Sequence, residues 1–217
     1  MVFDYKHKTP SADINIRLSL KSICADELVQ YENKYRFSKL CERQCVNYDR
    51  KWSCPPHSPA YTDYSKNYRY CLLILLSCRL SDFDHVKSGY MKVKTSNSIL
   101  KSQSDRLTRF LESELAGRML SNGSCRLCKP CSKKTSGDKC KKPEKLRYSM
   151  ESLGLNVAGI SQDYFNHPLL WYKNKTIPQY STVVSAVLTN KPLQNGDIES
   201  LIMKYFPACK INPVNNH

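Results

Sequence analysis

The chain contains 217 residues, 41% of them hydrophobic, and its 34 basic and 19 acidic residues give a formal net charge of +15. This hydrophobic content excludes an intrinsically disordered chain, and the length predicts one domain, residues 1–217, with a core of its own. No apolar run is long enough to cross a bilayer, and the N-terminus lacks the apolar segment of a signal peptide. We therefore predict a cytoplasmic protein that does not act in a membrane.

The first half of the chain alternates between strand-like and helix-like patterns. Residues 1–20 are expected to be irregular or extended, with a half-buried strand where polar and apolar residues alternate from Asp13 to Leu20. From Ala25 to Leu40 the apolar spacing becomes helical and predicts a helix. The face that we expect this helix to bury consists of Leu28, Tyr31, Tyr35 and Phe37. The short apolar run from Tyr70 to Cys78 predicts a buried central strand.

In the second half, apolar residues at helical spacing predict a long helix from Ser98 to Leu120. A short helix is expected at residues 149–153, ended by Gly154. The β-branched segment from Ser181 to Thr189 predicts another strand, and Asp197 to Phe206 a final helix. Helices and strands do not alternate regularly, so we predict an α+β fold: a small central sheet with flanking helices and two cysteine-rich cluster-binding loops.

The cysteine content is high, with eleven residues. The number is odd, no export signal is visible, and seven of the cysteines form two tight groups. Disulfides are typical of secreted chains, so metal binding is the better interpretation of this pattern. The four cysteines outside the groups are Cys24, Cys71, Cys78 and Cys209.

The second cysteine group is the more specific of the two. Cys125, Cys128 and Cys131 have the spacing C-x2-C-x2-C, and Cys140 follows after eight residues. This spacing lets one loop present three sulfur atoms to a 4Fe-4S cluster, as in bacterial ferredoxins, while a more distant cysteine completes the coordination. A zinc site is the alternative, although zinc sites more often pair two separate C-x2-C units.

The first group consists of Cys41, Cys45 and Cys54, and it ends in Trp52-Ser53-Cys54-Pro55-Pro56. If the preceding helix continues, the first two cysteines lie one turn apart on the same face. The presence of these three thiols predicts a second cluster. The sequence does not identify its fourth ligand, for which there are four candidates: His57, Cys24, Cys71 and Cys78. The fourth iron is alternatively open to a substrate and acts as a Lewis acid, or the site holds structural zinc. Trp52 is expected either to shield a cluster from water or to be an ordinary core residue.

Basic residues are concentrated between Lys129 and Arg147, around the second group. We interpret this concentration either as a surface that keeps the protein soluble or as a rim that guides an acidic redox partner or a polyanion. Arg147 and Glu151 follow Cys140 closely, and they are expected either to begin a helix under the cysteine loop or to line a pocket.

Taken together, these motifs resemble a prokaryotic family of metal-binding, iron–sulfur-type proteins with a domain of unknown function. The residues that carry the resemblance are Cys41, Cys45, Trp52, Cys54, Pro55, Pro56, Cys125, Cys128, Cys131, Cys140, Pro143, Arg147, Ser149, Glu151 and Gly154. The family-like region is residues 22–189, with 1–21 and 190–217 peripheral. The resemblance implies a bacterial or archaeal origin and metal or iron–sulfur binding, with no settled activity. This chain has Asp49 after Tyr48, where the family often has glycine.

These observations predict an iron–sulfur protein that binds up to two 4Fe-4S clusters and transfers electrons to an enzyme, with a redox protein as partner. The first alternative is an enzyme for sulfur transfer or desulfurisation at an open iron of the three-cysteine site, acting on a small-molecule substrate. The second is a zinc-stabilised module that binds nucleic acid or protein, suggested by the charge alone. The sequence assigns no catalytic residue.

Overall fold

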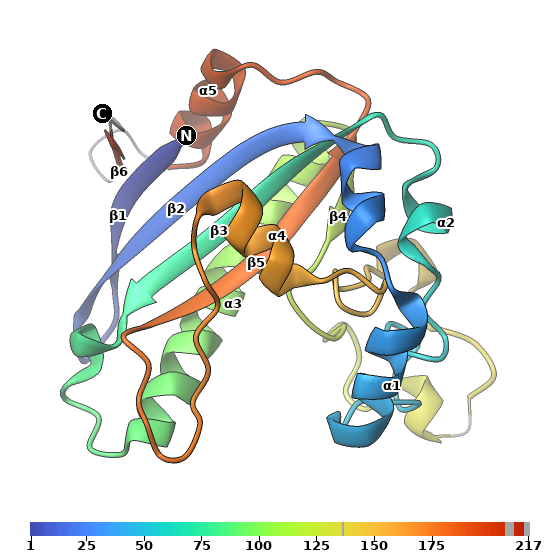
Figure 1. Cartoon of the computed structure of the whole chain (residues 1–217), viewed down its shortest axis with the longest axis horizontal. Helices are drawn as coiled ribbons and strands as arrows, with labels where there is room; N and C mark the ends of the chain where they lie inside the picture. Colours follow the sequence, from blue (N-terminus) through green and yellow to red (C-terminus); the bar gives the residue numbers. More distant parts are fainter. Residues whose placement is uncertain (136, 207–210, 215–217) are drawn as a thin grey trace.

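An antiparallel sheet of six strands forms the centre of the fold, in the order β4-β5-β3-β2-β1-β6 (Figure 1). The structure, a computed structural model, describes residues 1–135 and 137–206 and the backbone of 211–214. The strands are β1 (Val2–Lys8), β2 (Asp13–Cys24), β3 (Tyr70–Arg79), β4 (Arg118–Leu120), β5 (Tyr180–Thr189) and β6 (Ile211–Val214). The α+β class predicted from the sequence is confirmed.

The central position of β3 follows from its composition. Every residue from Cys71 to Cys78 is buried. Its backbone pairs with β2 on one side and with β5 on the other, so its hydrogen-bonding groups are satisfied without water. An apolar strand buried on both faces is the arrangement that the run of leucines predicted.

Helices α3 (Gly89–Glu114) and α5 (Asn195–Tyr205) cover one face of the sheet (Figure 1). Buried hydroxyl groups also connect α3 to β5, because the Oγ atoms of Ser104 and Ser185 lie 2.9 Å apart and Thr108 Oγ1 lies 2.9 Å from the same Ser185 oxygen. These contacts satisfy polar groups inside an otherwise apolar layer.

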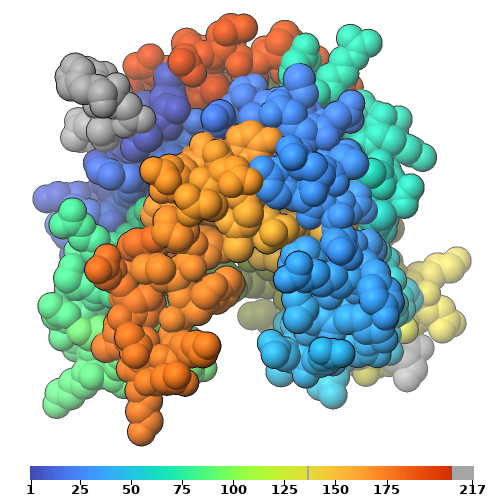
Figure 2. All heavy atoms as spheres, viewed as in Figure 1, coloured from blue at the N-terminus to red at the C-terminus, as the bar shows by residue number. Residues whose placement is uncertain are grey.

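The opposite face is covered by shorter elements. They are η1 (Ala25–Tyr31), α2 (Tyr61–Ser65), the turns at residues 149–155 and α4 (Val157–Phe165). The remaining short helices are η2 (Leu80–Phe83), η3 (Ser132–Thr135) and η4 (Pro143–Lys145). Helix α1 (Lys34–Gln44) buries none of its residues and projects from the sheet beside the cysteine segments (Figure 1). Figure 2 shows the surface hollowed between α1, in blue, and the orange segment that follows α4.

The helix predicted from Ala25 to Leu40 is interrupted, and this part of the prediction is wrong. Glu32 has an extended backbone that bridges to Leu155, and its carboxylate accepts hydrogen bonds from the amides of Tyr61 and Thr62. Helix α1 then restarts with Asn33 as its N-cap. The predicted buried face is confirmed for Leu28, which is buried, and for Tyr31, which packs against the core. It is wrong for the part on α1, where Tyr35 is 77% exposed.

The long helix predicted to end at Leu120 ends instead at Glu114, and it begins at Gly89 rather than Ser98. Ala116 adopts a positive φ of 47°, and a Cβ atom on Gly117 would lie 2.4 Å from the carbonyl oxygen of Leu188. The chain therefore turns here and pairs as β4, which the sequence analysis did not predict. Elements β6, α2 and α4 were not predicted either, and β1 corresponds to a segment expected to be irregular or extended.

The short helix predicted at residues 149–153 is wrong, because these residues form turns. Ser149 Oγ accepts a hydrogen bond from the amide of Ser152, and Gly154 follows with a φ of 95°. A Cβ atom on Gly154 would lie 2.7 Å from the Cα atom of Lys34. Glycine is therefore required where this turn packs against the start of α1.

The other predicted elements are confirmed with small changes of length. The strands at Asp13–Leu20, Tyr70–Cys78 and Ser181–Thr189 correspond to β2, β3 and β5, and the final helix corresponds to α5. Within the described part of the chain, no helix combines the length and the apolar character that membrane crossing requires.

Candidate metal centre

The four cysteines of the second group line one cavity. Cys125, Cys128, Cys131 and Cys140 come from residues 121–147, whose described part (121–135 and 137–147) contains no strand and only the short helices η3 and η4. Apolar side chains share the cavity wall with them: Trp52, Leu127 and Leu146. The structure thus brings together the four residues that the spacing predicted as ligands; that they bind a metal stays a prediction.

The cysteine loop is held against the first group by specific hydrogen bonds. The amide of Cys125 donates to Ser53 Oγ at 3.0 Å. Lys51 Nζ donates to Ser124 Oγ and to the carbonyl oxygen of Cys125, both at 2.9 Å. Residues 51–53 therefore position the first cysteine of the second group.

The cysteines of the first group also lie near one another. Cys41 lies on α1, and Cys45 ends this helix with its amide bonded to the Cys41 carbonyl, one turn apart as the sequence predicted. The pKa of the Cys54 thiol is raised to about 11, chiefly by burial and also by the nearby Cys45 and Cys41, while the hydrogen bond with Ser53 and the charge of Lys51 act in the opposite direction. A thiol in such a place binds metal by losing its proton to solvent.

The turn between the two halves of the first group depends on Asp49. This residue has a φ of 50°, in the left-handed region that favours glycine. Its carboxylate lies 2.7 Å from His57 Nε2 and 3.5 Å from Lys133 Nζ. The hydrogen bond with His57 lowers the pKa of Asp49, and Lys133 contributes in the same direction.

Trp52 lies between the two groups. Its Nε1 donates to Ser132 Oγ at 3.1 Å, and Lys133 Nζ lies 5.1 Å from the ring centroid. On its other side the ring packs edge-on against His57, with centroids 5.0 Å apart. Of the two roles considered for Trp52, the structure favours the one beside the metal centre, because its ring lines the thiol cavity.

The candidate fourth ligands of the first group are dispersed. Cys71 and Cys78 are buried within β3, and Cys24 is exposed at the end of β2. His57 lies next to the group, but its Nε2 is bonded to Asp49. Cys209, the last scattered cysteine, lies outside the described residues.

Two residues near the site were assigned differently, or not at all, from the sequence. Burial raises the pKa of Cys41, and Glu151 contributes after the nearby Cys45, so the Glu151 carboxylate lies close to the first group rather than beginning a helix. Arg147 lines a separate cavity and is paired with Glu112. The prediction that these two side chains line one pocket is therefore wrong.

Lys34 anchors the first group and was missed by the sequence analysis. Its Nζ donates to Ser58 Oγ at 2.8 Å and to the carbonyl oxygens of Pro59 and Ser152 at 2.9 and 2.5 Å. Burial lowers the pKa of this amine to about 8. A lysine directly after a helix N-cap gives no sequence signal for this role, because its partners, one hydroxyl group and two carbonyl oxygens, lie at least 24 positions away in the sequence.

Among the described residues, no three or more His, Cys, Asp or Glu side chains are arranged as the ligands of a single metal ion. The candidate centre therefore rests on the shared cavity and on the proximity of the thiols.

The fold and the site define an α+β protein with two adjoining cysteine groups. Residues 22–189 match the family model described as predicted metal-binding protein (DUF2284), and the chain belongs to this family. No curated protein matches the chain significantly, and neither does any solved structure.

Proposed function

We propose that the chain is an iron–sulfur protein that holds two 4Fe-4S clusters and passes electrons to a partner enzyme. Cys125, Cys128, Cys131 and Cys140 would bind one cluster, and the three cysteines Cys41, Cys45 and Cys54 the other. The observation that carries the proposal is the single cavity lined by all four thiols of the C-x2-C-x2-C group and Cys140.

The donor set fits such a cofactor. Four thiolates are the usual ligands of a 4Fe-4S cluster, which accepts and releases one electron when bound. Trp52, Leu127 and Leu146 add apolar surface around the thiols and would limit access of water. Exclusion of water and hydrogen bonds near the sulfur atoms are the means by which a protein sets the reduction potential.

The contacts between the two groups support a pathway through both. Ser53 accepts a hydrogen bond from the Cys125 amide, and its hydroxyl lies 3.8 Å from Cys54 Sγ. One serine thus contacts a cysteine of each group. This proximity is what a relay of electrons from one site to the other requires.

A basic surface beside the second group favours an acidic partner protein. Exposed lysines surround the thiol cavity along the segment that contains it: Lys129, Lys134, Lys139, Lys141, Lys142 and Lys145. Clustered charge of one sign accelerates association with a partner of opposite charge, and the effect weakens as salt is added. The rim interpretation of these basic residues is therefore part of the proposal.

A second candidate function is catalysis of sulfur transfer or desulfurisation at the first group. The observation that favours it is the hydrogen bond between His57 Nε2 and Asp49. This nitrogen is therefore already engaged and does not serve as a fourth ligand beside the three thiols. A three-thiol site leaves one position for a substrate sulfur or oxygen atom. Added small thiols would then change the spectrum of the first site alone.

The test is a measurement of iron, sulfide and zinc per chain after purification without oxygen, with the visible spectrum and the paramagnetic signal after dithionite. About eight irons with matching sulfide and a reversible one-electron signal are expected. About four irons would restrict the proposal to the second group. A colourless protein with zinc would overturn both redox functions and leave a zinc-stabilised binding module.

A further inference from the structure

A second cavity lies between α3 and the segment that follows β4, and the metal proposal does not use it. It contains about 850 Å³ of empty space, counted with the solvent at its mouth. Five cationic side chains line it: Lys101, Arg106, Arg109, Arg126 and Arg147. Asp105 is the single carboxylate among the lining residues.

The cations of this cavity are incompletely neutralised. Arg109 pairs with Asp105 at 3.3 Å, and Arg147 pairs with Glu112 behind the cavity wall. Among the described side chains, no carboxylate pairs with the other three cations, Lys101, Arg106 and Arg126. Two of the five cations are therefore paired with a carboxylate, and the other three keep an unpaired positive charge on a concave surface.

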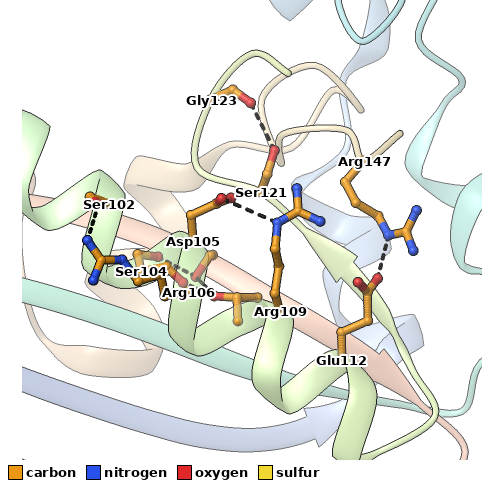
Figure 3. Close-up of polar contacts among 11 residues, drawn as sticks. Ser102, Ser104, Asp105, Arg106, Arg109, Glu112, Ser121, Gly123 and Arg147 are labelled. Atoms are coloured by element: carbon orange, nitrogen blue, oxygen red, sulfur yellow. Dashed lines mark hydrogen bonds and ion pairs between the residues drawn. The ribbon is translucent and has the colours of Figure 1, made fainter. Parts of the chain in front are cut away.

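Figure 3 shows how two of these arginines are arranged. The side chain of Arg109 extends from α3 toward the loop that contains Ser121 and Gly123, and that of Arg147 turns toward Glu112. Arg106 points along α3 to Ser102, whose Oγ lies 3.2 Å from Arg106 Nη2. Guanidinium groups present several N–H donors in a plane, a geometry that matches the oxygens of phosphate.

Asn122 contributes an unpaired polar atom next to these cations. The Nδ2 atom of Asn122, another lining residue, is buried and has no hydrogen-bond partner. An unpaired buried donor is costly and is uncommon in folded proteins. Because this nitrogen is closed off from solvent, an anionic oxygen in the cavity would pair with it only after the Asn122 side chain rotates.

We propose that this cavity binds a small molecule through a phosphate group. Several cations around one hollow suit a dianion with several oxygens better than a single carboxylate. Cys125 lines both this cavity and the thiol cavity. The rest of the molecule would lie beside the second cysteine group, a step that rests on the proposed function, whereas binding of the phosphate itself does not.

The test is calorimetric titration of the anaerobically purified protein with inorganic phosphate and pyrophosphate, in a buffer free of other oxyanions. Arg109→Gln and the double variant Arg106→Gln/Arg109→Gln are compared with Arg79→Gln. Arg79 is an exposed arginine at the end of β3 that lines neither cavity. Circular dichroism and thermal unfolding confirm that each variant is folded.

We expect the affinity for pyrophosphate to fall at least about tenfold in Arg109→Gln and further in the double variant, since each charged hydrogen bond contributes strongly. Arg79→Gln should retain the affinity within about twofold. Equal losses in all variants would assign the binding to diffuse surface charge and overturn the proposal. Binding of polyuridylate that neither small anion displaces would also overturn it, in favour of a nucleic acid.

A third result would contradict the proposal in another way. If neither anion binds but the double variant shifts the reduction potential, the arginines serve to compensate the charge of the metal site. The two proposals fail separately. A zinc-containing protein that binds pyrophosphate retains this inference and loses the redox function, and an iron protein that binds neither anion does the reverse.

Discussion

Trp52 Nε1 lies 3.1 Å from Ser132 Oγ, and this hydrogen bond joins the two cysteine groups across 80 positions of the sequence. The serine is 4% exposed and also donates to the carbonyl oxygen of Lys139. One indole ring thus fixes the loop between Cys131 and Cys140 against the first group. Its replacement is the most direct way to uncouple the groups without touching a cysteine.

In Trp52→Phe the apolar wall remains while the donor to Ser132 is lost. We expect the free energy of unfolding to fall by about 1 kcal/mol, the net contribution of a typical hydrogen bond. Metal release to a chelator should accelerate as well, and both are measured on the purified metal-bound protein. Trp171→Phe is the control, because Trp171 is 72% exposed. Equal effects of the two changes would contradict the bridging role of Trp52.

Asp49 combines an uncommon backbone conformation with a polar contact, and substitutions separate the two. Both Asp49→Gly and Asp49→Ala remove the contact with His57. Glycine tolerates the φ of 50°, whereas alanine is strained in this conformation. We expect the alanine variant to be less stable than the glycine variant by about 1 kcal/mol. Denaturant unfolding measures this difference, and equal stabilities would show that the turn relaxes.

Lys34→Met removes three hydrogen bonds while keeping the apolar stem. We expect a loss of roughly 2 kcal/mol or more in stability, because the carbonyl oxygens of Pro59 and Ser152 lose a donor in a half-buried place. The damage should be local, with metal lost from the first group before the second. Spectroscopic titration with a chelator follows this order, and Lys66→Met, at an exposed position, serves as control.

Cysteine substitutions distinguish the proposed ligands from the buried thiols of the sheet. Cys128→Ala should remove the metal of the second site, since one of its four donors is lost. Cys71→Ala should keep the full metal content and lose only about 1 kcal/mol of stability through a smaller core side chain. Metal analysis of both variants decides the assignment, and loss of metal in Cys71→Ala would place that residue at a site.

The central strands and the cysteine groups were predictable because each has a local signal. The run from Tyr70 to Cys78 is apolar except for Ser77, and the spacing of Cys125, Cys128 and Cys131 restricts them to one loop. Both signals act over fewer than a dozen residues. The structure accordingly has β3 buried at the centre and these cysteines around one cavity.

The features that were missed depend on contacts between distant residues. Glu32 interrupts the predicted helix because its carboxylate binds the amides of Tyr61 and Thr62. The basic cavity arises where α3 meets the segment after β4, so Arg109 and Arg147 come together only in the folded chain. Neither arrangement leaves a periodic pattern that a single sequence displays.

His167 provides a test of pH dependence away from the cysteines. Its Nε2 lies 2.8 Å from Thr182 Oγ1, and its ring centroid lies 4.5 Å from that of Tyr180. Burial lowers the pKa of His167 below its ordinary value of 6.5, and the positive charge of Arg17 adds to this effect. The folded protein therefore holds this imidazole neutral at a pH where the unfolded chain has begun to protonate it.

As the pH falls through 6.5, the unfolded state binds more protons at His167 than the folded state, so the free energy of unfolding decreases. The contribution of the neutral His167 to the free energy of unfolding is fully present above the pKa of the unfolded state. It is lost as the pH falls toward the lower pKa of the folded state. His167→Gln should therefore show a smaller drop in urea midpoint between pH 7 and pH 5 than the unsubstituted protein. Identical drops in His167→Gln and in the unsubstituted protein would show that His167 protonates as readily in the folded chain as in the unfolded one.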